Sequence, residues 1–201
     1  MVTHLAFGLG LGYPYALRAD PNCPDDQAFA DVPWPIEIPT GVDALGAFQV
    51  EMGRCIDTFY ATSPSEPCYT YQGPGVAAFW FRRAAIETTL HRMDVAEALG
   101  WLDLPLSAER TGDALAEAVE FALPLAARWT QSELPAMLLN SGDAHDELLL
   151  GTGEPVASIT GDGIGLLSAL WGRSDEHISI DGNAEVARAW LTVVEKAFAG
   201  R

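Results

Sequence analysis

Cysteine is scarce in this sequence, and the cysteines present do not suit two common kinds of small domain. Cys23, Cys55 and Cys68 are odd in number and include no C-x-x-C pair. A disulfide framework needs cysteines in pairs, and a zinc ribbon needs them closely spaced. We therefore exclude both kinds of domain and expect three ordinary reduced thiols.

Basic residues are also few. Lys and Arg number 11 against 28 Asp and Glu, which gives a formal net charge of −17, and no basic cluster reverses that balance locally. Such a chain is repelled by phosphate backbones and by anionic lipid surfaces. We expect neither nucleic acid nor a membrane among its partners.

Long apolar runs are missing as well. No run reaches the ~18 to 20 residues that a membrane-spanning helix needs. The opening stretch MVTHLAFGLGLGYPYALR is apolar, but it has neither a basic start nor a small-residue cleavage site. We expect no signal peptide and a cytoplasmic protein.

The first part of the sequence has the apolar spacing of helices. With 201 residues and a hydrophobic share of 49%, the chain is large enough to bury a core. Apolar spacing and runs of alanine predict helices over residues 41–61, 75–98 and 107–127. Residues 2–17 are a weaker helix candidate because three glycines interrupt them. Together these segments predict a helical domain over residues 1–130.

The pattern changes in the last third of the chain. After a linker, QSELPAMLLNSGD, short stretches bounded by glycine predict strands in DELLLGTG, EPVASITGD and HISIDG. GIGLLSALWGR predicts a short helix, and NAEVARAWLTVVEKAF predicts a longer one that Asn183 caps. We therefore expect a small α+β domain over residues 136–201 and an α+β fold for the whole chain.

One stretch of the helical part, FRRAAIETTLHRMD, combines residue types that bind metals. Glu87 and His91 are four residues apart, so a helix places them on one face, where they can chelate one ion. Asp94 follows three residues later on the same side and could orient the His91 ring as a hydrogen-bond acceptor. The apolar segment AAFWF precedes the pair, which indicates that this helix is at least partly buried.

Simpler readings of the same residues stay open. Chance gives a Glu four residues before a His in roughly one such chain in four, and the pair can be a solvated helix pair. Arg83, one turn before Glu87, could form an ion pair with it or offer a bidentate fork to a substrate carboxylate.

The arrangement resembles the mycothiol-dependent maleylpyruvate isomerase family, within the larger DinB-like group of metal-binding four-helix bundles. In FRRAAIETTLHRMDVAEALG the family pattern falls on Arg83, Glu87, His91, Asp94 and Gly100.

Two further segments are similar to the same family. VTHLAF resembles the segment that bears the family's first histidine ligand, here His4. GDGIGLLSALWGR followed by HISIDGNAEVARAWL resembles the family's small C-terminal domain, which is related to sterol-carrier-like folds. The resemblance covers nearly the whole chain and implies a DinB-like helical domain followed by a small α+β domain.

The resemblance implies a metal site and a cofactor. His4, Glu87 and His91 would bind zinc with one position open, although the same ligand set also suits Fe2+. Asp94 would lie behind His91, and Arg83 or Arg82 would hold a substrate carboxylate. Mycothiol would supply the thiol, so the protein would not need a nucleophilic cysteine.

The implied chemistry is that of an isomerase or a thiol transferase. The metal-bound thiolate would add to an activated cis double bond of a small electrophilic substrate. The resulting single bond can rotate, and expulsion of the thiol leaves the trans isomer. A transferase on this scaffold would share the first step.

One departure from the family pattern supports a different function. Family members carry a full first helix and the start of the second before the HL dipeptide, whereas this chain begins three residues before it. The expectation is therefore an incomplete bundle in which His4 lies on a fraying terminus and apolar side chains are uncovered. The alternative function is a non-catalytic metal-binding or remnant protein that acts through self-association or partner binding.

Overall fold

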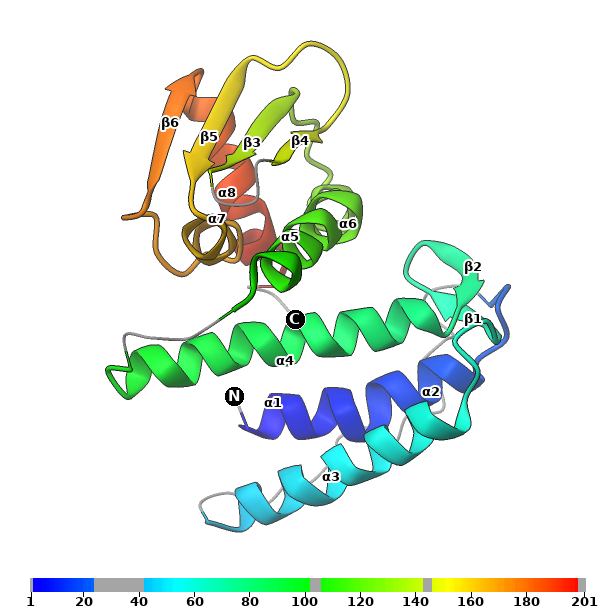
Figure 1. Ribbon diagram of the computed structural model, residues 1–201. Helices are drawn as coiled ribbons and strands as arrows, with labels where there is room; N and C mark the ends of the chain where they lie inside the picture. The colour runs from blue at the N-terminus through cyan, green and yellow to red at the C-terminus, as the bar shows by residue number, and fades with distance from the viewer. Residues whose placement is uncertain (1, 24–41, 102–105, 143–145, 199–201) are drawn as a thin grey trace. The chain divides into compact units, whose positions relative to one another are not determined.

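The computed structural model has a mixed helix and sheet fold, which confirms the predicted α+β class (Figure 1). The described residues are 2–23, 42–101, 106–142 and 146–198. The chain divides into two compact units, Met1–Leu104 and Pro105–Arg201. Within the described ranges, every helix is too short or too polar to cross a lipid bilayer.

The first unit is built from helices and one hairpin. Its elements are α1 (Val2–Phe7), the π-helix η1 (Gly8–Gly12), α2 (Tyr13–Arg18), α3 (Val42–Ala61), β1 (Pro67–Thr70), β2 (Gly73–Val76) and α4 (Ala78–Ala98). α1, η1 and α2 follow one another without a break, and Figure 1 shows them running between α3 and α4. The helices predicted over 41–61 and 75–98 are thus present with closely similar limits.

Glycine in η1 lets the first helix approach α3 closely. A Cβ atom added to Gly10 would lie 2.7 Å from Cβ and Cδ of Glu51 on α3, which is closer than real side-chain contacts. An added Cβ at Gly12 would meet nothing within 4 Å. The glycines that weaken the helix prediction therefore have different uses, and Gly10 is required for packing.

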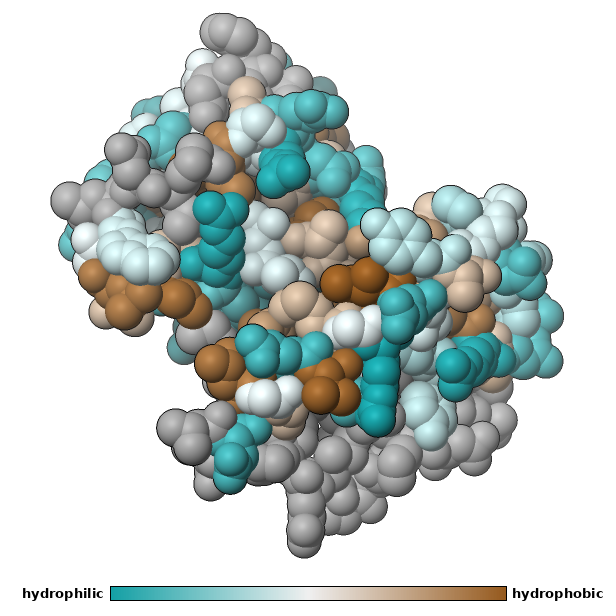
Figure 2. Space-filling model, turned by 60° about the horizontal axis from the view of Figure 1, so that its bottom comes forward, coloured by the Kyte–Doolittle hydropathy of each residue, from teal (hydrophilic) through white to brown (hydrophobic). Residues whose placement is uncertain are grey.

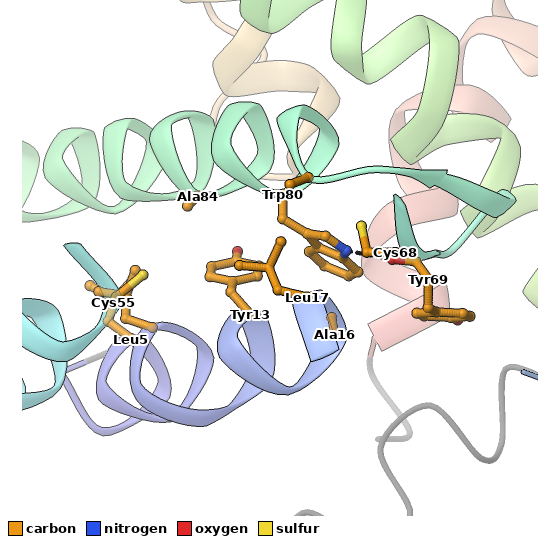
Figure 3. Packing of buried hydrophobic residues seen from close by; sticks show 11 residues of the cluster. Leu5, Tyr13, Ala16, Leu17, Cys55, Cys68, Tyr69, Trp80 and Ala84 are labelled. Carbon is orange, nitrogen blue, oxygen red and sulfur yellow. Dashed lines mark hydrogen bonds between the residues drawn. The ribbon is translucent and has the colours of Figure 1, made fainter. Parts of the chain in front are cut away.

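The core of the first unit lies between α1, η1, α2, α3, α4 and the hairpin. Its buried members are Leu5, Leu9, Tyr13, Ala16, Leu17, Cys55, Cys68, Tyr69, Ala77, Trp80 and Ala84 (Figure 3). Trp80 is 1% exposed, and its Nε1 donates to the backbone oxygen of Tyr69 at 2.6 Å. That hydrogen bond joins the start of α4 to β1 and satisfies the one polar atom of the indole ring.

The second unit packs helices against a four-stranded sheet. Its elements are α5 (Ala108–Glu117), the π-helix η2 (Ala118–Ala122), α6 (Leu123–Trp129), β3 (Met137–Ser141), β4 (Asp146–Leu150), β5 (Ala157–Gly161), α7 (Gly163–Leu170), β6 (Ile178–Gly182) and α8 (Ala184–Phe198). The strand order is β4-β3-β5-β6, with β3 and β5 parallel and the other pairs antiparallel. Asn183 caps α8, as predicted, because its side chain accepts from the backbone of Glu185 and Val186.

Two expectations from the sequence differ from the structure. The segment read as a linker contains β3, a central strand whose alternate residues Met137 and Leu139 are 0% and 1% exposed. The single helix expected over residues 107–127 of the first domain is present as α5, η2 and α6. These elements belong to the second unit, because α5 packs against α7 and α6 packs against α8. The division between units therefore lies near residue 104 and not between residues 130 and 136.

Helix α3 carries several apolar side chains that are exposed to solvent. Leu45, Ile56 and Tyr60 are 55%, 47% and 88% exposed. At 3.6 residues per turn these three positions lie within roughly 60° of one another around the helix. Figure 2 shows one face of the molecule, on which apolar residues form several small groups among polar ones.

Candidate metal centre

α4 carries most of the candidate site. Its regular turns put Glu87, His91 and Asp94 along one side, as the spacing predicts. The helix ends where Leu99 and Gly100 close it, and Gly100 has a positive φ of 67°, the conformation expected of a glycine after a helix. The length of α4 therefore keeps all three side chains well inside the helix and away from its ends.

α1 brings the third candidate ligand to this side of α4. Nε2 of His4 donates to Oε1 of Glu87 at 2.9 Å, and the ring centroids of His4 and His91 are 5.3 Å apart. Ligand atoms of His4, Glu87 and His91 all lie within 4.8 Å of one another. His4 lies within a regular helix, α1, and the residues that follow it, Leu5 and Ala6, are buried.

Asp94 lies behind His91. The distance from His91 Nδ1 to Asp94 Oδ2 is 2.8 Å, so a protonated Nδ1 donates to the carboxylate. In that tautomer the lone pair of the ring is on Nε2, the nitrogen that remains for a metal. The structure thus brings together all four residues that the sequence singles out for the metal site.

Arg83 lies on the Glu87 side of this group. It is 7% exposed, and its Nε is 3.8 Å from Oε2 of Glu87. A guanidinium so deeply buried and so close to a carboxylate suits the ion pair better than a fork open to a substrate. Arg82, the neighbour considered for the same task, is half-buried on the same helix.

Tyr13 is a residue that sequence reasoning missed. Its hydroxyl, at the start of α2, donates a hydrogen bond to Oε2 of Glu87. A regular helix through residues 2–17 would have turned this side chain away from His4, so spacing alone gave no reason to choose it. The sequence feature at this point is the triplet of alternate glycines, which interrupts the regular helical pattern between His4 and Tyr13.

These contacts set the charges in the site. Burial alone would raise the pKa of Glu87, but the hydrogen bond from His4, the charge of Arg83 and the hydrogen bond from Tyr13 outweigh it and lower that pKa to about 2. The hydrogen bond to Glu87 raises the pKa of His4. Burial, followed by the charge of Glu87, raises the pKa of Tyr13 well above 10, so its hydroxyl stays a donor at neutral pH.

The donor set fits a divalent metal ion. Two imidazole nitrogens and one ionised carboxylate oxygen match the ligands of zinc sites that keep a position open, and ferrous iron accepts the same set. A Cβ atom added to Gly8 would meet only Oε1 of Glu87, at 4.0 Å, so this part of η1 leaves space beside the carboxylate. An ion here would take the place of the proton between His4 and Glu87.

Comparison with known proteins gives a fold relationship. No protein-family model matches the sequence, and no curated protein matches it either. Two solved structures do match, the mycothiol-dependent maleylpyruvate isomerase, with a TM-score of 0.57, and a histidine-to-alanine mutant of it, with a TM-score of 0.55. Each is 12% identical to this chain, and each match covers 91% of this chain and 77% of the other. At this identity the likeness establishes a shared fold.

Proposed function

We propose that this protein is a zinc-dependent enzyme that uses a small thiol, mycothiol, to isomerise or modify a small electrophile. The observation that carries the proposal is the convergence of His4, Glu87 and His91 from two helices, with Asp94 behind His91. The shared fold with a mycothiol-dependent maleylpyruvate isomerase supports the choice of thiol and of reaction.

Each residue of the site has a separate task in this proposal. His4, Glu87 and His91 hold the metal, and Asp94 fixes the ring of His91 so that Nε2 faces it. A bound zinc ion lowers the pKa of a coordinated thiol and so supplies a thiolate near neutral pH. Of the two roles expected for Arg83, the geometry favours the ion pair, which keeps Glu87 ionised.

The buried cysteines support the use of an external thiol. Burial raises the pKa of Cys55 to about 11, and burial with the charge of Glu66 raises that of Cys68. Both side chains are at most 2% exposed. Because a neutral buried thiol is a poor nucleophile, neither residue suits the role of the attacking group.

A turnover assay tests the proposal. Zinc-loaded protein, mycothiol and maleylpyruvate are mixed, and isomerisation is followed by absorbance with and without the thiol. We expect turnover that needs both zinc and mycothiol, that disappears in His91→Ala and that persists in the matched control His177→Ala, whose histidine is exposed in the second unit. Equal turnover in His91→Ala would contradict the proposed site.

A second candidate function is a non-catalytic metal-binding protein that acts through self-association. Leu45, Ile56 and Tyr60, which are exposed on one side of α3, favour it, because exposed apolar side chains on one face can mark a contact surface. Light scattering would decide between the two. A dimer in the wild type that dissociates in Ile56→Asp, without turnover in either, supports the alternative, and a catalytically active monomer contradicts it.

A further inference from the structure

The two oxygens of Glu87 have different partners. His4 contacts Oε1, whereas Tyr13 and Arg83 lie at Oε2. Tyr13 is 6% exposed and packs against Trp80, with ring centroids 5.4 Å apart. Figure 3 shows the Tyr13 ring beside Trp80 with its oxygen directed toward α4. Packing therefore fixes the direction from which the hydroxyl reaches the carboxylate.

The π-turn explains how one helix supplies both contacts. Tyr13 follows His4 by nine residues, and a regular α-helix would place residues at that spacing roughly 180° apart, on opposite sides. A π-turn accommodates one extra residue, so the two positions behave as if they were about eight residues apart, roughly 80° around the axis. Because η1 lies between them, His4 and Tyr13 can contact the same side chain.

We propose that Tyr13 is a positioning residue for the metal centre. Its hydroxyl holds Oε2 of Glu87, so that Oε1 is the oxygen presented to His4 and His91. A carboxylate held in this way offers the ion one oxygen, which leaves a coordination position for a substrate or thiol. This inference rests on the metal site of the proposed function, and it adds a residue to which that function assigned no role.

The variant Tyr13→Phe removes the hydroxyl and keeps the ring that packs on Trp80. Tyr15→Phe is the matched control, because Tyr15 lies on the same short helix α2 and is only half-buried. Zinc affinity is measured by competition with a chelator, and the visible absorption spectrum is recorded at saturating Co2+. Thermal unfolding of the metal-free proteins reports on folding.

We expect about 10- to 100-fold weaker zinc binding in Tyr13→Phe, the usual effect of removing a group that orients a ligand, and wild-type affinity in Tyr15→Phe. We also expect a changed Co2+ spectrum in Tyr13→Phe, because Glu87 can then turn and offer both oxygens. A residue that only filled space would leave the spectrum of the saturated protein unchanged.

Four results overturn the inference in distinguishable ways. Wild-type affinity in Tyr13→Phe, or weaker binding with an unchanged Co2+ spectrum, contradicts the role of Tyr13 while the metal site stands. A wild-type protein that binds no zinc contradicts the metal site itself, and the inference with it. If Tyr13→Phe does not fold, NMR of the zinc-loaded wild type tests the inference instead. The phenolic proton of Tyr13 must then show a nuclear Overhauser effect to Glu87. The absence of that effect overturns the inference.

Discussion

At the scale of single residues, the site is organised around the charge of Glu87. Its carboxylate is one-fifth exposed, yet contacts with His4, Arg83 and Tyr13 keep it ionised. The sequence predicted the partners that lie on α4, because helical spacing fixes which side chains share a face. It could not predict Tyr13, whose direction depends on a local change of helix type.

The pH dependence of the metal-free protein follows from the two shifted groups. The raised pKa of His4 gives stability that is full below its usual 6.5 and is lost as pH rises through the folded value. The lowered pKa of Glu87 gives stability that is full above its usual 4.5 and is lost as pH falls toward 2. The contribution of the pair is therefore greatest between pH 4.5 and 6.5.

Urea unfolding at several pH values measures this effect. We expect the pair to contribute at most about 1 kcal/mol to the free energy of unfolding, because the His4 side chain is more than half exposed to solvent. His4→Ala should lack the loss of stability above pH 6.5 that we expect in the wild type. An identical pH profile in the two proteins would contradict the pairing of His4 with Glu87.

The buried thiol of Cys55 provides another prediction. Because its pKa is about 11, the thiol is neutral at neutral pH. We expect Cys55→Ala to keep the zinc binding and the mycothiol-dependent turnover that we propose for the wild type. The variant should lose about 1 kcal/mol of stability, since the side chain is 2% exposed in the core. Loss of turnover in a folded variant would instead make Cys55 a participant in the reaction.

At the scale of elements, the sequence predicted the regular helices but not the π-helical segment η1. The limits of α3, α4 and α8 agree closely with their apolar spacing and with the caps at Asn183 and Gly100. The strand β3 was missed because polar and glycine residues surround a short apolar run, and a strand of that length depends on its neighbours. The packing of η1 likewise involves a distant part of the sequence, because Gly10 lies against Glu51 of α3.

A pair of alanine variants separates the two uses of glycine in η1, which are freedom of the backbone and close packing against α3. Gly12→Ala places its Cβ in open space at φ −55°, so we expect a gain of roughly 0.5 to 1 kcal/mol from reduced backbone freedom. Gly10→Ala drives its Cβ into Glu51, which also pairs with Arg54 at 2.7 Å, so we expect a loss of roughly 1 to 3 kcal/mol.

Chemical unfolding of both glycine variants checks these signs. Gly12→Ala is the matched control, because it also replaces a glycine of η1 but places the new Cβ atom in open space and not against Glu51. Equal changes in the free energy of unfolding at the two positions would mean that glycine in η1 only permits the π-helical backbone and is not needed for the contact with α3.

At the scale of the whole molecule, a metal bound at the proposed site would join distant parts of the first unit. His4 and His91 are far apart in sequence and come from α1 and α4, so an ion bound by both cross-links these helices. The sequence predicted the α+β class, whereas it placed the boundary between units too late, because helical periodicity does not reveal which core α5 and α6 cover.

Zinc should therefore raise the thermal stability of the folded protein. Binding to the folded state alone contributes about 2.7 kcal/mol at a free zinc concentration 100 times the dissociation constant. We expect a higher unfolding temperature for the wild type and for His177→Ala, measured by calorimetry with and without zinc, and no such rise for His91→Ala. A similar rise in all three proteins would indicate zinc binding elsewhere on this acidic chain.

Zinc stoichiometry is the most direct measure of whether His4, Glu87 and His91 form one metal site. Wild type, His4→Ala, Glu87→Gln, His91→Ala and His177→Ala are loaded with zinc, freed of excess metal and analysed by plasma mass spectrometry. We expect one tightly held zinc ion per chain in the wild type and in His177→Ala, and loss of that ion in the other three variants. Zinc retained in both His4→Ala and His91→Ala, or no zinc in the wild type, would contradict that expectation.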